Sequence, residues 1–161
     1  MTMFGHHALV VGAMGRLGTA ICDVYEGLGV AVSKVDLGSG SRGEVPDVIP
    51  ELGWREDDWM RSLETLQHRK GAVTHLIFAF RHRAEVMSTE AIEQQILTAY
   101  HLPEMLVMAL IKAQDDSRTA SKLSSIVFTG SPLANFASQQ QPHSYHYVKG
   151  GELALARSFA I

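Results

Sequence analysis

The sequence predicts an α/β fold in which a doubly wound parallel sheet has helices on both of its faces. Short apolar runs alternate with amphipathic segments along the chain, which is typical of parallel strands joined by crossover helices. A glycine-rich turn at residues 12–18 follows the first apolar run directly. The length of 161 residues and the hydrophobic content of 46% favour a single domain, 1–161, with a substantial core.

The first half of the chain predicts two strand–helix steps. Residues 8–11 are Ala-Leu-Val-Val and indicate a short buried strand. Residues 15–28 have apolar side chains at helical spacing, and Gly29 fits the stop of that helix. Residues 30–35 indicate a second strand, whereas 37–50 are rich in Gly, Ser and Pro and predict a loop.

Capping residues mark two further helices. Asp57 or Asp58 is expected to cap a helix that ends near His68. Ser88 is the candidate cap of a long helical stretch at 88–113, which Pro103 should kink or split. The remaining segments are a strand at 75–80, a charged loop at 81–85, a polar loop at 114–122, a strand at 125–129, a loop at 131–144 and a helix at 145–161.

Composition excludes several classes of function. The net charge of −3 gives no basic footprint for nucleic acid, and no apolar run approaches the length of a membrane span. Cys22 is the only cysteine and no signal peptide is recognisable, so a reducing, cytoplasmic location is expected. The eight histidines form no helical pair with a carboxylate partner, so no metal site is predicted.

The turn at residues 12–18 has the spacing G-x-x-G-x-x-G, a variant of the dinucleotide-binding fingerprint. Gly12 permits the tight turn, Gly15 lets backbone approach a pyrophosphate, and Gly18 allows the helix to pack closely on the strand. The helix N-terminus then offers N–H groups and a positive dipole end to the phosphates. We therefore expect a Rossmann-type domain with cofactor contacts from Gly12, Met14, Gly15, Arg16, Leu17 and Gly18.

Asp36 indicates which dinucleotide is bound. It ends the second strand about 20 residues past the glycines, where an acidic side chain holds the ribose hydroxyls of the adenosine. Its carboxylate would repel a 2′-phosphate, so NAD is favoured over NADP. The nearby cations Lys34, Arg42 and Arg16 would weaken this preference, which leaves NADP open.

Two motifs in the second half extend the interpretation. An apolar strand ends in Thr129-Gly130-Ser131, and Tyr145 is followed at Y-x-x-x-K spacing by Lys149. With the glycine turn, this resembles the short-chain dehydrogenase/reductase family, whose serine, tyrosine and lysine occur in this order and at about this separation. Tyr147 is set aside because no lysine lies four residues beyond it.

The resemblance implies an NAD(P)-dependent oxidoreductase that transfers a hydride between a nicotinamide cofactor and a small carbonyl or alcohol. Tyr145 would exchange a proton with the substrate oxygen, and Ser131 would position that oxygen by a hydrogen bond. A free tyrosine has a pKa of about 10, which a neighbouring ammonium lowers. Lys149 would supply that ammonium and also hold the nicotinamide ribose.

The chain departs from the family pattern in three places. Residues 77–81 stand where many members have an Asn-Asn-Ala-Gly-like segment, so Ala79 is carried over only loosely as a contact on the adenine side. Gln95 aligns with the asparagine that supports the lysine through water in many members. The chain ends in the helix of Tyr145, before the last strands of the family, so an incomplete domain is expected.

Two other functions remain open. One is a non-catalytic dinucleotide-binding regulatory protein, and the other is a sugar-nucleotide epimerase or dehydratase, which the glycine spacing favours. The resemblance also implies a homodimer or homotetramer formed through the long helix and the Tyr145 helix. Leu102, Met105 and Leu106 are the candidate interface residues.

Overall fold

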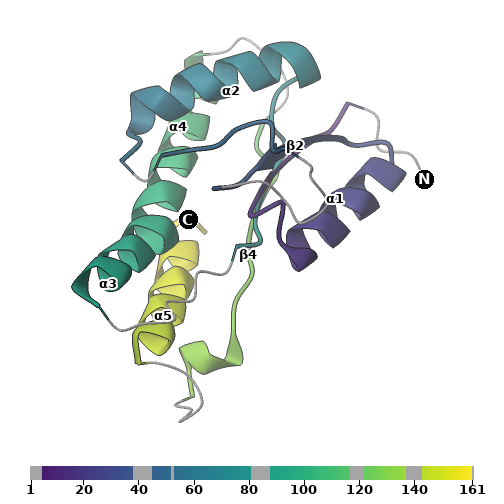
Figure 1. Cartoon of the computed structure of the whole chain (residues 1–161). Helices are drawn as coiled ribbons and strands as arrows, with labels where there is room; N and C mark the ends of the chain where they lie inside the picture. Colours follow the sequence, from purple (N-terminus) through teal and green to yellow (C-terminus); the bar gives the residue numbers. More distant parts are fainter. Residues whose placement is uncertain are drawn as a thin grey trace.

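A computed structural model describes residues 5–37, 45–51, 53–80, 88–116, 122–136 and 143–160 (Figure 1). The predicted loop at 81–85 lies outside these residues, as do Arg42 and parts of the other predicted loops. The elements in chain order are β1 (His7–Val11), α1 (Arg16–Gly27), β2 (Ala31–Val35), α2 (Glu56–Lys70), β3 (His75–Phe78), α3 (Thr89–Ile96), the π-helix η1 (Leu97–His101), α4 (Leu102–Asp116), β4 (Ser125–Phe128), the 3₁₀ helix η2 (Pro132–Ala134) and α5 (His143–Ser158).

Within the described residues, β1 to β4 form one parallel sheet in the order β2-β1-β3-β4. Val10 of β1 pairs with Lys34 of β2 on one side and with Ile77 of β3 on the other. The chain therefore changes direction across the sheet between β1 and β3. At such a switch point the loops after the two strands diverge and leave a crevice at their carboxyl ends.

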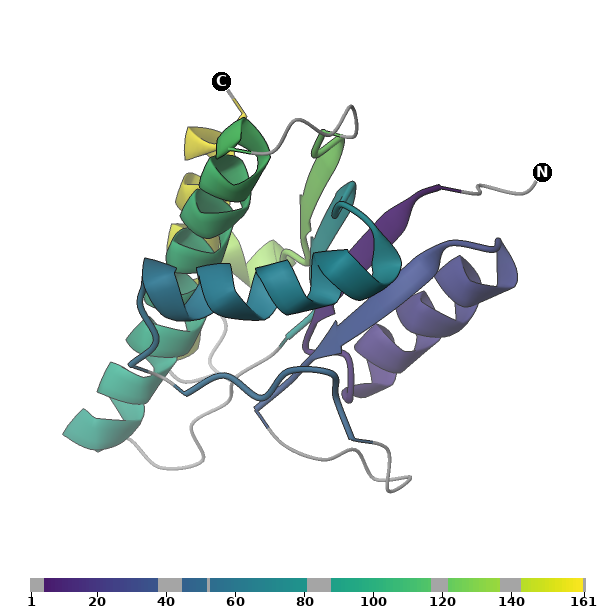
Figure 2. The same ribbon diagram turned by 90° about the horizontal axis from the view of Figure 1, so that it is seen from above.

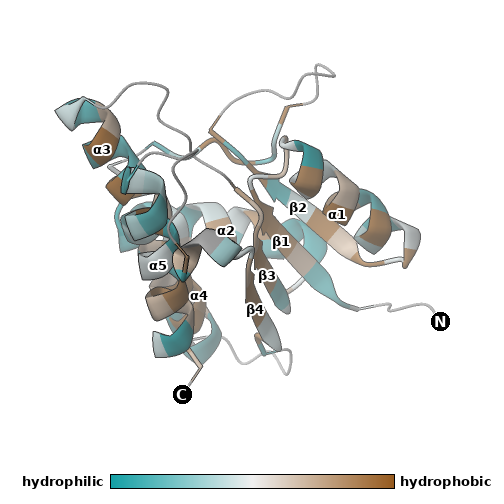
Figure 3. Ribbon diagram, turned by 90° about the horizontal axis from the view of Figure 1, so that it is seen from below, coloured by the Kyte–Doolittle hydropathy of each residue, from teal (hydrophilic) through white to brown (hydrophobic). Residues whose placement is uncertain are grey.

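The sheet has a helical layer on each face, as predicted (Figures 1 and 2). Side chains alternate along a strand, so Leu9 and Val11 face the layer of α2 and α4, whereas Ala8 and Val10 face α1. All five residues of β1 are buried, as expected for a central parallel strand. Figure 3 shows the hydrophobic residues concentrated on these strands, between the two layers.

The cap of α2 differs from the prediction. The helix begins at Glu56 with Arg55 as its N-cap, so neither Asp57 nor Asp58 is the cap. Asp58 lies in the first turn, and its carboxylate accepts a hydrogen bond of 2.9 Å from the backbone N–H of Arg55. Acidic side chains in the first turn and at the cap give the same sequence signal, since both favour the positive end of the helix dipole.

The long helix begins as predicted and then changes its winding. The Ser88 hydroxyl accepts a hydrogen bond of 3.1 Å from the N–H of Ala91, which confirms the cap. Pro103 does not split the helix. Instead, the preceding residues form the π-helix η1, and α4 continues to Asp116. A proline lacks the N–H that the ladder needs, and a local widening of the helix accommodates that loss.

This helix also changes two expectations. Residues Thr89–Asp115 are long and apolar enough to cross a membrane by length and composition, although no such run was expected.

Leu102 and Leu106 are buried in the core beside α2, so they are not available for the predicted oligomer interface. The exposed apolar side chains of α4 are instead Met108 and Ile111.

Candidate functional site

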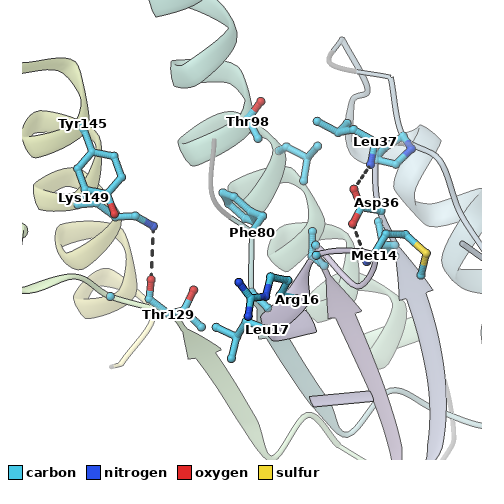
Figure 4. A pocket seen from close by; sticks show the side chains of 18 residues that line it. Met14, Arg16, Leu17, Asp36, Leu37, Phe80, Thr98, Thr129, Tyr145 and Lys149 are labelled. Atoms are coloured by element: carbon cyan, nitrogen blue, oxygen red, sulfur yellow. Dashed lines mark hydrogen bonds between the residues drawn. The ribbon is translucent and has the colours of Figure 1, made fainter. Parts of the chain in front are cut away.

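A cleft of about 640 Å³ opens at the carboxyl ends of the strands. It lies above the switch point between β1 and β3, where a ligand site is expected in this type of fold. Most of the residues singled out from the sequence line it, namely Gly12, Met14, Gly15, Arg16, Leu17, Asp36, Ala79, Tyr145 and Lys149. Segments far apart in the sequence, from Val11 to Lys149, therefore meet in one cavity (Figure 4).

The three glycines of the turn differ in how much room the surrounding backbone leaves for a side chain. Gly12 has a φ of +82°, and a Cβ there would lie 2.6 Å from the backbone of Phe80. A Cβ on Gly18 would lie 2.0 Å from the carbonyl oxygen of Gly12. On Gly15, however, it would meet only that same oxygen, at 3.4 Å. The fold itself thus requires Gly12 and Gly18, whereas Gly15 is exposed at the cleft.

The N-terminus of α1 faces the cleft without a cap from the described part of the chain. Its N-cap residue is Gly15, which has no side chain to accept a hydrogen bond, and the first turn contains no acidic residue. The first N–H groups of a helix have no acceptor within the helix. Together with the guanidinium of Arg16, which also lines the cleft, they form a local site of positive potential.

Asp36 connects the end of β2 to the glycine turn. One carboxylate oxygen accepts a hydrogen bond of 2.8 Å from the N–H of Met14, and the other accepts one of 2.8 Å from the N–H of Leu37. Figure 4 shows this group on the side of the cleft opposite α5. The two bonds hold the carboxylate in place at the cleft wall and leave further lone pairs for a ligand hydroxyl.

Tyr145 and Lys149 form the opposite wall (Figure 4). They lie one turn apart on α5, so their side chains share a face of the helix. The Lys149 side chain is only 5% exposed, and its Nζ donates to a carboxylate oxygen of Glu152 at 2.6 Å and to the carbonyl of Thr129 at 3.4 Å. This ammonium is thus held between its own helix and the end of β4.

Three residues predicted for the site do not line the cleft. Gly18 is buried in the contact between α1 and the turn. Ser131 lies two residues beyond Thr129, and its carbonyl accepts the N–H of Ala134 at 3.0 Å, at the start of η2. Gln95 is 2% exposed, and its Oε1 has no hydrogen-bond partner among the described residues.

Sequence reasoning missed several residues of the cleft. Phe80 follows Ala79 and lies half-buried in the middle of the cleft, in contact with Gly12 (Figure 4). Thr98 and Thr129 also line it. A usable signal existed for Thr129, because it ends an apolar strand, and the ends of parallel strands meet at the same edge.

The structure resembles those of known enzymes, although no family model and no curated relative matches the sequence. One similar structure is a glucose/ribitol dehydrogenase from Brucella melitensis, with a TM-score of 0.73 and 19% identity. Another is the aldohexose dehydrogenase of Thermoplasma acidophilum, with a TM-score of 0.76 and 19% identity. A third is a short-chain dehydrogenase from Leptospira borgpetersenii with bound NAD⁺, with a TM-score of 0.75 and 15% identity.

Each of these similarities covers 96% of this chain. The chain spans 68%, 60% and 64% of the three structures, in the same order. At these identities the comparison concerns the fold, which agrees with the motifs at the glycine turn and at Tyr145. The chain therefore has the fold of the short-chain dehydrogenases/reductases.

Proposed function

We propose that this chain binds a nicotinamide dinucleotide and provides the acid–base residues for hydride transfer to or from a small carbonyl or alcohol. The observation that carries the proposal is the single cleft with Asp36 on one wall and the Tyr145–Lys149 pair on the other. The glycine turn and the uncapped N-terminus of α1 lie along the same cleft. Each of these groups suits a different part of a dinucleotide.

The charged groups fit the cofactor in a definite direction. A pyrophosphate suits the N-terminus of α1, where backbone N–H groups and Arg16 offer positive charge and Gly15 leaves room. A ribose with two free hydroxyls suits Asp36, because a carboxylate accepts hydrogen bonds and repels a 2′-phosphate. The nicotinamide end then lies toward α5, and NAD is the preferred form.

On this proposal, Tyr145 exchanges a proton with the substrate oxygen through its phenol group. The bound cofactor supplies or accepts the hydride. Within the described residues, Lys149 donates two hydrogen bonds, to Glu152 and to the carbonyl of Thr129. Its third N–H donor can serve a ribose hydroxyl or the phenol oxygen of Tyr145. A nearby ammonium stabilises a phenolate, so proton exchange near neutral pH becomes easier.

Cofactor binding is the first test, because most of the residues assigned to the cofactor line the described cleft. NADH is titrated into the purified protein, and its fluorescence or the heat of binding is followed. Gly15→Val should weaken binding at least tenfold by filling the space beside the helix N-terminus. Gly27→Val is the matched control, since a Cβ at Gly27 meets no atom within 4 Å. A parent protein that binds no NADH at millimolar concentration would overturn the proposal.

Turnover is tested with a panel of small alcohols and carbonyls by following NADH absorbance. Tyr145→Phe should lose roughly 100- to 10,000-fold in rate, the usual contribution of an acid–base group. Tyr147→Phe is the control on the same helix, because Tyr147 is half exposed and does not line the cleft. Tight cofactor binding without turnover across the panel would favour a dinucleotide-binding regulatory protein.

A further inference from the structure

The buried pair of Lys149 and Glu152 is not explained by the motif that identified the lysine. Glu152 lies on α5, three residues beyond Lys149, with its side chain 7% exposed. It does not line the cleft, although Lys149 does. A buried carboxylate is costly unless it is paired, so its position calls for a reason.

We propose that Glu152 is the counter-ion that keeps Lys149 protonated and aimed at the end of β4, and is thus a positioning residue for the cleft. The Nζ–Oε2 distance of 2.6 Å is that of a charge-assisted hydrogen bond. The same Nζ reaches the carbonyl of Thr129 at 3.4 Å. Glu152 and Thr129 therefore hold the ammonium from two sides. The functional part of this inference rests on the proposed cofactor site.

The electrostatics of the pair support this role. Burial raises the pKa of the Glu152 carboxyl, and the hydrogen bond and charge of Lys149 oppose this effect. A lysine with the same burial but no anion beside it would lose its proton far more easily. Buried lysines without a partner titrate several pH units below the ordinary value of about 10.4. A neutral Lys149 would be a weaker partner for a ribose hydroxyl or a phenolate.

Glu152 also acts on the phenol of Tyr100, which lies on η1. Burial raises the pKa of Tyr100 to about 12, and Tyr147 and Glu152 add to this effect by their charge. Tyr100 therefore stays neutral and cannot replace Glu152 as the negative counter-charge of Lys149. On α3, Glu90 and Glu93 are exposed, and the half-buried His101 of η1 lines a separate surface hollow. On α5 itself, the titratable or charged side chains besides the pair are His143, Tyr145, His146, Tyr147 and Arg157. Neither β4 nor η2 contains a titratable side chain.

The direct test measures the titration of Lys149 without any cofactor. Lysine side chains labelled with ¹³C at Cε are followed by NMR, and Lys149→Arg identifies the signal. In Glu152→Asp the signal should titrate as it does in the parent. In Glu152→Gln it should titrate at least one unit lower. An unchanged titration in Glu152→Gln would overturn the inference, whether or not the protein binds NADH.

The second readout is the affinity for NADH as a function of pH. Between pH 6 and pH 9, Glu152→Gln should lose about tenfold more affinity than the parent, because its lysine becomes neutral. Glu56→Gln is the matched control, since it neutralises an exposed ion pair with Lys112 away from the cleft. A shifted Lys149 titration with no NADH binding in any variant would leave the pairing intact and defeat the proposed function instead. A shifted titration with an unchanged pH profile of NADH binding would overturn the positioning role.

A double variant tests the pairing in the event that Glu152→Gln does not fold. Removing one member of a buried ion pair leaves an uncompensated charge, whereas replacing both with apolar residues is often tolerated. If Glu152→Gln does not fold, Lys149→Met combined with Glu152→Leu should restore folding. A double variant that is no more stable than the single one would overturn the pairing.

Discussion

The Cα of Gly18 packs against the carbonyl oxygen of Gly12, so closely that a Cβ on Gly18 would stand 2.0 Å from that oxygen. The first turn of α1 is thereby held against the end of β1. Since Gly18 is buried and does not line the cleft, its role is in packing. Gly15 is the reverse case, exposed at the cleft with an ordinary φ of −73°.

Gly18→Ala is accordingly expected to lower the free energy of unfolding by about 3 kcal/mol or more, as for a severe overpacking substitution. The melting temperature should fall by roughly 10 °C in a domain of this size. Gly15→Ala should change the free energy of unfolding by less than about 1 kcal/mol. Thermal unfolding of both variants checks this difference, and equal losses would show that Gly15 is also required for packing.

Asp36→Ser should separate a structural effect from a cofactor effect. The loss of two accepted backbone hydrogen bonds, from Met14 and Leu37, should reduce the free energy of unfolding by about 1–3 kcal/mol. Removal of the carboxylate should also lower the preference for NAD over NADP by roughly tenfold. Dissociation constants for NADH and NADPH measure that preference.

Asp47→Ser is the control for this experiment. Asp47 accepts a backbone hydrogen bond from Lys34 and pairs with Lys70, but it does not line the cleft. Its loss should reduce stability without changing the NADH/NADPH ratio. If the ratio of the NADH and NADPH dissociation constants changed equally in Asp36→Ser and Asp47→Ser, Asp36 would act only through the stability of the fold.

The parts of the site that the sequence predicted are those set by local patterns. The glycine turn and the Tyr145–Lys149 spacing lie within single segments, where chain geometry alone determines which side chains come together. Their meeting in one cleft follows from parallel strands, whose carboxyl ends share an edge. The strands were recognisable because every residue of β1 is buried and apolar runs mark such strands.

The parts that were missed depend on contacts between distant segments. The burial of Glu152 beside Lys149 follows from the packing of α5, and no periodicity reveals it. Gln95 of α3 lies only three residues before Thr98 of η1, yet only Thr98 lines the cleft. The π-helix η1 lies between the predicted cap at Ser88 and the rest of α4, so the faces of the helix could not be assigned by counting from Ser88.

Stability should fall below about pH 6.5 because of His7. This side chain is 1% exposed, with its ring nitrogens 2.7 Å from the Gly71 carbonyl and 2.9 Å from the Ser33 hydroxyl. Burial lowers the pKa of His7 below its ordinary 6.5, against the opposing effect of the Gly71 carbonyl. Below pH 6.5 the His7 side chain therefore binds a proton in the unfolded chain but not yet in the folded protein. This contribution is complete above pH 6.5 and is lost as the pH falls toward the folded pKa.

Chemical denaturation at a series of pH values measures this dependence. His7→Gln should reduce the slope of stability against pH by up to about 1.4 kcal/mol per pH unit, the value for one proton. Part of the dependence of stability on pH should remain in His7→Gln, because burial and the nearby His6 lower the pKa of His75 as well. The control is His68→Gln, because His68 is exposed. If the slope of stability against pH were the same in His7→Gln as in His68→Gln, the assignment to His7 would be wrong.

Gly151 and Gly150 of α5 should respond oppositely to alanine. In a helix interior, alanine is normally more stable than glycine by about 0.5–1 kcal/mol. Gly150→Ala should show this gain, because its Cβ would lie 3.7 Å from the carbonyl of Ala134. A Cβ on Gly151 would lie 2.2 Å from the hydroxyl of Tyr100, so Gly151→Ala should lower the free energy of unfolding by about 2–3 kcal/mol. Thermal unfolding of the two variants compares them directly.

The stability lost in Gly151→Ala is expected to come from the contact between η1 and α5. The Tyr100 hydroxyl donates to the carbonyls of Tyr147 and Val148 at 2.9 Å, and only a residue without a Cβ at position 151 lets the ring approach. Tyr100→Leu removes both the ring and the clash, so Gly151→Ala should be much less harmful in that background. Additive effects of the two substitutions would show that Gly151 is required for another reason. Since Lys149 lies on the same stretch of α5, cofactor affinity should fall with stability in Gly151→Ala and stay at the parent level in Gly150→Ala.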